Sequence, residues 1–165
     1  MELGESFVGE GVDAAHVNTV LGAREGPVGQ AWATGLASPS AGHTPFVVVL
    51  QPGLPVVPFT LFVNKARIDG EGHGRLTWGA AQAGVASGVI DAVAAGTIDE
   101  EDAAGLALIA AVWVDPEARD ADLVFANNRE ATAGALALGR AGLPTAADVL
   151  EQRDEPWNPY FRNPG

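Results

Sequence analysis

Between residues 60 and 140 the sequence alternates between apolar runs typical of β-strands and long segments with helical periodicity. Residues 60–68 and 106–114 are apolar enough for buried strands. The segment 77–95 lies between them and ends before Gly96, and its apolar positions recur at helical spacing at Trp78, Val85, Val89 and Val93. A second long helix is expected over 118–140. Strands that alternate with helices predict a domain of the α/β class.

The first third of the chain is expected to begin with a β-hairpin made of residues 5–11 and 14–22. A helix is predicted over 27–37, since Gly26-Pro27 is a typical helix start. The continuous apolar run 46–50 predicts a strand that is covered on both faces. The segment 51–58 contains three prolines and is expected to be a loop.

Three glycines in residues 69–74 predict a turn or a mobile loop, and the four acids of 99–102 are typical of a solvated turn. A short helix is expected over 145–152. The chain lacks repeats and interior linkers, so residues 1–154 are interpreted as one domain. Residues 155–165 form a tail that is too rich in proline to be helical.

Composition excludes several classes of function. The 165 residues carry a formal net charge of −12, with eight arginines and a single lysine, which argues against a nucleic-acid partner. The chain has no cysteine, no paired-histidine spacing and no GxSxG or HExxH motif, so we expect no metal site and no serine hydrolase. With neither an 18-residue apolar run nor a signal sequence, a soluble cytoplasmic protein without a membrane partner is expected.

His16 is the strongest catalytic candidate among the three histidines. In the strand around it, Val17, Thr19 and Leu21 occupy one face, so His16 and Asn18 share the opposite, outward face. A hydrogen-bonded surface histidine remains the alternative interpretation. His43 and His73 lie in glycine-containing turns and are expected to be solvated.

Lys65 and Arg67 are expected to share one face of the strand 60–68, because they are two residues apart. Two cations in so acidic a chain form a local positive patch suited to a carboxylate or a heterocycle carbonyl. Surface salt bridges are the alternative. Gln82 lies in an apolar helix and either binds backbone or faces a cleft. Gly84 and Gly88 are four residues apart and predict close helix packing.

Several ordered sequence blocks resemble the formaldehyde-activating enzyme family over residues 5–154. They are Val8-Gly9-Glu10-Gly11 with Ala15-His16, Leu54-Pro55 with Pro58, Thr60 and Asn64-Lys65, Gly79-Ala80-Ala81-Gln82, Asp91 to Ile98, and Pro144 to Leu150 with Gln152-Arg153. The resemblance implies a two-layer α/β sandwich with a left-handed β-α-β crossover, like the second domain of ribosomal protein S5.

The resemblance further implies a lyase of one-carbon metabolism that condenses formaldehyde with tetrahydromethanopterin to the methylene derivative and water. Such enzymes are homopentamers with the active site between neighbouring subunits, and need no metal or prosthetic group. The catalytic histidine of the family corresponds to His16, and its pterin-contacting lysine and glutamine correspond to Lys65 and Gln82. Two positions depart from the family pattern, where an acid becomes Asn18 and a threonine becomes Arg67. A leucine contact becomes Val47, which is a minor change.

Because of these departures, the resemblance implies the type of reaction more firmly than it implies the substrate. One alternative is the same fold acting on another amine or aldehyde in a biosynthetic pathway, which Arg67 favours because its guanidinium suits an additional carboxylate. A second alternative is a non-catalytic carrier of a pterin or an aldehyde adduct. Retention of His16 argues against the carrier, since binding alone needs no proton donor.

Overall fold

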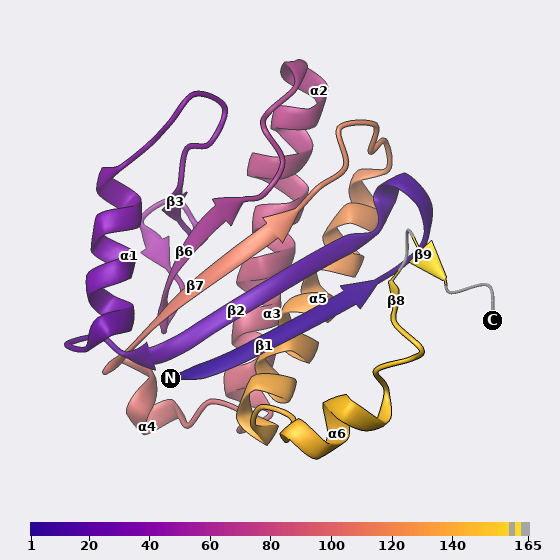
Figure 1. The fold of residues 1–165 in the computed structure, drawn as a ribbon. Coiled ribbons are helices and arrows are strands. Elements are labelled where there is room, and N and C mark those ends of the chain that lie inside the picture. The colour runs from indigo at the N-terminus through magenta and orange to yellow at the C-terminus, as the bar shows by residue number, and fades with distance from the viewer. Residues whose placement is uncertain (159–160, 163–165) are drawn as a thin grey trace.

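The computed structural model describes residues 1–158 and 161–162, as Figure 1 shows. Its elements follow in the order β1 (Glu2–Val8), η1 (Gly11–Asp13), β2 (Ala15–Ala23), α1 (Pro27–Ala37), β3 (Phe46–Val47), β4 (Val49–Gln51), β5 (Leu54–Pro55), β6 (Phe59–Asn64), α2 (Gly70–Arg75), the π-helical segment η2 (Leu76–Ala81), α3 (Gln82–Ala94), α4 (Glu100–Ala103), β7 (Leu106–Trp113), α5 (Ala121–Ala141), α6 (Ala146–Glu151), β8 (Trp157–Asn158) and β9 (Phe161–Arg162).

Five strands form the main sheet in the order β1-β2-β7-β6-β3. All neighbouring pairs are antiparallel except β6 and β7, which are parallel and are joined through α2, η2, α3 and α4. Helices α3 and α5 form a layer behind the sheet, while α1 lies at one end of the other face (Figure 1). The mixed α/β class and the two layers are thus confirmed, whereas the hand of the crossover stays a prediction.

The predicted N-terminal hairpin is confirmed and its register places the side chains of interest. Residue Glu5 pairs with Asn18, and Phe7 pairs with His16. Along β2 every second residue from Ala15 to Leu21 is buried, and the residues between them are half-buried. The buried set faces α5. The half-buried set, which includes His16 and Asn18, therefore lies on the face that the α3/α5 layer leaves uncovered, called the open face below.

Glycines allow α3, α5 and the sheet to pack closely. A Cβ atom at Gly84 or Gly88 would lie 2.5 Å from a backbone carbonyl oxygen of α5, that of Phe125 or Arg129 respectively. A Cβ at Gly4 of β1 would lie 1.7 Å from the carbonyl oxygen of Ala135. The close helix packing predicted from the spacing of Gly84 and Gly88 is therefore confirmed.

The core lies between this helix pair and the sheet. Valines of α3 at positions 85 and 89 are fully buried, as the helical periodicity predicts. They pack in one cluster with apolar side chains of the central strands, among them Val17, Phe62, Leu108, Ala110 and Val112. Burial of this set supplies the main driving force for the fold.

Two strand predictions are wrong in their extent. The run 46–50 is divided between β3 and β4, and only Val48 is fully buried, while Leu50 is 51% exposed. Among the described residues, β3 is an edge strand of the main sheet. The strand predicted over 60–68 ends at Asn64, whose side-chain amide donates to the carbonyl oxygens of Gly42 and Ala66. These two side-chain bonds hold the turn that the chain makes after β6.

The segment 69–74, predicted as a turn or mobile loop, is mostly helical and forms the start of α2. His73, predicted to be solvated, is only 4% exposed. Its Nδ1 accepts a hydrogen bond from the Asp69 backbone N–H, and its Nε2 donates to the Val114 carbonyl oxygen, both at 3.0 Å. These two bonds hold a glycine-rich segment in helical form. Trp78, expected to belong to the core repeat, is 51% exposed because η2 shifts the helical phase before α3 begins.

The C-terminal elements agree with the sequence where they are described. Helix α6 begins after Thr145, whose side chain and that of Asp148 form a capping box. Two-residue strands β8 and β9 pair beyond it. Residues 159–160 and 163–165 of the predicted tail lie outside the described residues. Within the described part of the chain, no helix is both long and apolar enough to cross a membrane.

A methyl group at the tightest helix contact is expected to destabilise the domain. In Gly88→Ala the new Cβ would press on the backbone of α5 at Arg129, and such overpacking costs about 1–3 kcal/mol. Gly79→Ala is the matched control, because no atom lies within 4 Å of its Cβ position. Urea denaturation of both variants measures the difference; equal free energies of unfolding would contradict the packing argument.

Candidate active site

Four polar side chains gather on the open face near the end of the hairpin. His16 and Asn18 come from β2, Glu5 from β1, and Lys65 from the residue that follows β6. The register places Asn18 opposite Ala111 of β7. Lys65 comes from the other side of β7, so only the methyl group of Ala111 lies between the two side chains. The outward position predicted for His16 and Asn18 agrees with their half-buried state.

Glu5 is the carboxylate that contacts the histidine. Its Oε1 lies 2.8 Å from His16 Nε2, although the angle falls outside the range of a well-formed hydrogen bond. The His16 side chain is 34% exposed, and Phe7 lies beside its ring with 5.8 Å between the ring centroids. Burial lowers the pKa of His16 and the Lys65 ammonium lowers it further, whereas the charge and hydrogen-bonding capacity of Glu5 raise it.

Lys65 is held close to this pair by Asn18. Its Nζ donates a hydrogen bond of 2.6 Å to Asn18 Oδ1, and its backbone N–H donates to the Val112 carbonyl oxygen. Burial lowers the pKa of Lys65 to about 8, and Glu5 acts in the opposite direction. With a pKa of about 8, this ammonium group is still positively charged at neutral pH. Because burial causes the low pKa, the group is also poorly hydrated. Such a group interacts strongly with an incoming carbonyl or carboxylate oxygen.

A groove of about 640 Å³ adjoins the cluster. Lys65, Arg67, Trp113 and Pro116 contribute to its lining. Trp113 pairs with His16 across β2 and β7, and its indole Nε1 is buried without an acceptor among the residues described. Arg67 is exposed, and a Cβ at Gly42 would lie 2.3 Å from its Cγ, so its aliphatic stem packs on that glycine. The expectation that Lys65 and Arg67 share a strand face fails, because β6 ends before both, yet they line one groove.

Val47 and Gln82 do not join this cluster within one chain. Val47 belongs to the edge strand β3, three strands from β2, which corresponds to about 14 Å at the usual spacing. Gln82 begins α3 in the helix layer, and its Oε1 accepts a 2.7 Å hydrogen bond from the Val49 backbone N–H. Of the two interpretations for this glutamine, the structure shows the backbone bond. The predicted site residues thus form two separate groups.

Sequence reasoning missed Glu5 and Trp113. Both face the histidine across strand pairs, so their roles depend on the register of β1, β2 and β7. The length of the loop between residues 8 and 15 does not fix that register, because η1 occupies part of it. The sequence marks Glu5 only as an acid in a segment of β-type alternation. That feature does not distinguish it from other acids of this chain.

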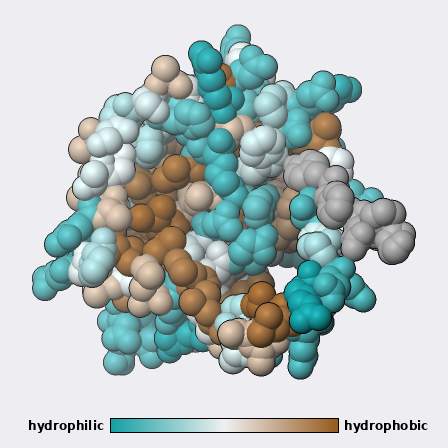
Figure 2. All heavy atoms as spheres, in the orientation of Figure 1, coloured by the Kyte–Doolittle hydropathy of each residue, from teal (hydrophilic) through white to brown (hydrophobic). Residues whose placement is uncertain are grey.

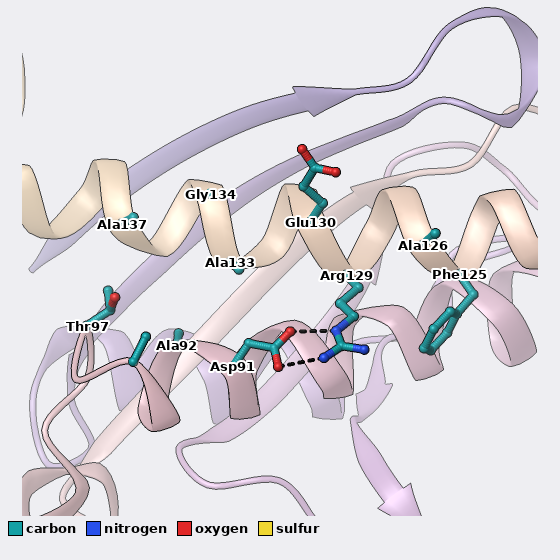
Figure 3. A pocket seen from close by; sticks show the side chains of 11 residues that line it. Asp91, Ala92, Thr97, Phe125, Ala126, Arg129, Glu130, Ala133, Gly134 and Ala137 are labelled. Atoms are coloured by element: carbon teal, nitrogen blue, oxygen red, sulfur yellow. Dashed lines mark hydrogen bonds and ion pairs between the residues drawn. The ribbon is translucent and has the colours of Figure 1, made fainter.

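A second groove, of about 680 Å³, lies between α3 and α5 on the far side of the helix layer (Figure 3). Arg129 crosses it to Asp91 with two hydrogen bonds of 2.5 and 2.8 Å, and this pairing lowers the pKa of Asp91. Most other lining residues are alanines, and no histidine is among them. Outside the ion pair, Glu130 is the one titratable group that lines this groove. The open-face cluster, which combines a histidine, a carboxylate and a lysine, is therefore the better candidate site.

A two-layer α/β domain that gathers a histidine, a carboxylate and a lysine on an open sheet face has the parts of an acid–base enzyme. No cluster of three or more metal-ligating side chains occurs in the described ranges. The profile of the formaldehyde-activating enzyme (Fae) family matches residues 3–161, and the chain belongs to this family.

Individual relatives show the same similarity. The chain is 39% identical to the 5,6,7,8-tetrahydromethanopterin hydro-lyase of Methanosarcina barkeri over 96% of its own length and 89% of that protein. It is 42% identical to the bifunctional enzyme Fae/Hps of Methanococcoides burtonii over 93% of its own length. The chain spans only 39% of that bifunctional protein.

Lys65 is expected to make stability depend on pH. Its folded-state pKa of about 8 lies below the ordinary 10.5, so between these values the folded protein has lost the proton that the unfolded chain still binds. Stability from this group therefore rises with pH across that window. The free energy of unfolding of the wild type, measured relative to Lys65→Met, is expected to increase from pH 8 to 10. Parallel curves in urea titrations would contradict it.

Proposed function

We propose that this protein condenses formaldehyde with a reduced pterin of the tetrahydromethanopterin type, giving the methylene derivative and water. The single observation that carries the proposal is the contact between His16 and Glu5 on the open face, next to the Lys65 ammonium. Family membership supports it, as does the similarity to the 5,6,7,8-tetrahydromethanopterin hydro-lyase of Methanosarcina barkeri. In this proposal the enzyme is a carbon–oxygen lyase and the pterin is a co-substrate.

His16 acts as the general acid. The pterin nitrogen attacks the carbonyl carbon of formaldehyde, and the adduct becomes a carbinolamine after proton transfer. His16 then protonates the carbinolamine hydroxyl, the C–O bond breaks with its electrons on oxygen, and water leaves. A second substrate nitrogen closes on the resulting iminium carbon, and the proton it releases returns to the imidazole. An imidazole titrates near neutral pH and therefore suits both transfers.

Lys65 and the adjoining groove bind the substrate. The ammonium group, fixed by Asn18, points a charged donor at a carbonyl oxygen of the heterocycle, and Trp113 offers a flat apolar surface beside it. Arg67 lines the same groove and adds a second cation. That observation favours the alternative in which the fold serves another amine that carries a carboxylate. The reaction chemistry at His16 is the same in both cases.

The enzyme works as a homopentamer in this proposal, with each site formed by two neighbouring chains. Val47 and Gln82 are separated from His16 within one chain, so a site that uses both groups requires a second copy. Apolar side chains gather on the open face over the central strands (Figure 2). Val63 and Ile109 are half-buried and alternate with core residues of β6 and β7, so they lie on this face. Trp78 and Trp157 are 51% and 69% exposed, as is typical of interface aromatics.

Two further assignments are proposed on the sequence alone. The cytoplasm is the proposed compartment. Residues 1–154 are the proposed catalytic domain, and the remaining residues are the proposed tail. The family match runs to residue 161 and so includes part of this tail.

Removal of the imidazole is expected to slow catalysis strongly while substrate binding persists. His16→Ala should lower kcat for formaldehyde and tetrahydromethanopterin by about 10²–10⁴-fold, the usual contribution of a positioned acid. His43→Ala is the control, since His43 bonds the Asn64 carbonyl oxygen at the edge of the sheet. Rates are followed by formaldehyde consumption, with tetrahydrofolate as a second amine. Turnover that does not depend on His16 would refute the mechanism, and turnover of other amines alone would favour the alternative substrate.

A shared site is expected to show complementation between inactive chains. Co-expressed His16→Ala and Gln82→Ala chains should regain about a quarter of wild-type activity, because random assembly joins two intact halves at one interface in four. Each variant alone should be nearly inactive, and light scattering should show a pentamer for both. A stable wild-type monomer, or mixed oligomers without activity, would contradict the intersubunit site.

A further inference from the structure

Glu5 contacts His16 from a strand that carries no other part of the site. Its Oε1 lies 2.8 Å from Nε2, and Nε2 itself is shielded from solvent. The side chain as a whole is nevertheless 34% exposed, so the accessible part of the ring lies elsewhere. Substrate on the open face therefore meets the part of the imidazole that is turned away from Glu5.

The identity of the buried nitrogen determines where the protons lie. A carboxylate at this distance repels a nitrogen lone pair and attracts an N–H, so the neutral ring carries its proton on Nε2. Protonation then occurs at Nδ1. The proton that the imidazolium gives up most readily is the one on Nδ1, because the Nε2 proton is held by the charge of Glu5.

We propose that Glu5 is a positioning residue that holds the His16 ring through Nε2 and makes Nδ1 the nitrogen that transfers the proton. The inference rests on the proposed role of His16 as general acid. Glu5 reaches the ring because the β1–β2 register places it opposite Asn18, on the same face as the histidine. Its residue type is needed as well: a neutral side chain there would leave the proton free to move between the two nitrogens.

The charge of Glu5 opposes two influences that favour the neutral ring. The groups that face His16 are Glu5 and Phe7 on β1, Asn18 on β2, Trp113 on β7 and Lys65 after β6. Of these, Glu5 and Lys65 are the charged groups. Burial and the Lys65 ammonium lower the pKa of the imidazole, and Glu5 raises it. Lys65 is needed near the site to bind substrate. Glu5 thus keeps a larger fraction of His16 in the protonated, acid form, although the nearby Lys65 cation disfavours that form.

The test compares Glu5→Gln with Glu2→Gln. Both remove one carboxylate from β1, but Glu2 pairs with Arg140, away from the cluster, and serves as the control. Nitrogen–proton correlation NMR of the imidazole gives both the titration and the tautomer. The wild-type neutral ring is expected to carry its proton on Nε2. Glu5→Gln should shift the His16 titration to lower pH by roughly 0.5–1 unit, and Glu2→Gln should leave it unchanged.

Activity supplies the second readout. The rate of a general acid falls as pH rises through its pKa, so in Glu5→Gln this fall should begin at lower pH, with a three- to tenfold loss at pH 7.5 that diminishes toward pH 5.5. A loss equal at every pH, a wild-type proton on Nδ1, or titrations that coincide in both variants would overturn the proposal. If the wild type shows no turnover of formaldehyde with any amine, the proposed function fails, and the NMR result separately decides whether Glu5 orients the ring.

Discussion

The alternation of side chains along β2 is the constraint on which both the core and the candidate site depend. Ala15, Val17, Thr19 and Leu21 are buried against the helix layer, so the residues between them must face the other way. A register shift of one residue would bury His16 and expose Val17. The loss of apolar burial in the core makes that register unfavourable. The imidazole is therefore held on the open face by apolar residues that never contact it.

The charges around His16 come from residues on neighbouring strands. Lys65 reaches Asn18 across β7 because the intervening side chain is that of Ala111. The lysine brings positive charge toward the histidine, and Glu5 brings negative charge from the opposite side. In the proposed mechanism both partners are needed, because Lys65 would bind the substrate and Glu5 would keep His16 able to act as an acid beside that cation. Asn18 carries no charge where the family pattern has an acid, and Glu5 supplies a carboxylate to the histidine from the neighbouring strand.

Local signals predicted most elements, and contacts distant in sequence account for the differences. The spacing of Val85 and Val89, the start at Pro27 and the hairpin around Gly9 each depend on a few neighbouring residues, and these predictions are confirmed. The helical form of 70–75 depends on bonds from His73 to Val114, 41 positions away, which no local pattern contains. The end of β6 likewise depends on Asn64 reaching Gly42. For the site, alternation alone placed His16 and Asn18 outward, whereas Glu5 and Trp113 required the register.

The two faces of the sheet differ in how completely they are packed, and this difference bears on the chemistry. Gly4, Gly84 and Gly88 let the helix layer close tightly on one face, with backbone against backbone. On the open face Val63, Ile109 and Trp113 remain half-buried beside the polar cluster. Apolar surroundings lower the local dielectric constant and so strengthen the interaction between Glu5, His16 and Lys65. In the proposed pentamer, a second chain that covered these apolar residues would strengthen it further and would add a Gln82 to the site. Under that proposal, assembly and acid–base tuning both depend on the face that the single chain leaves uncovered.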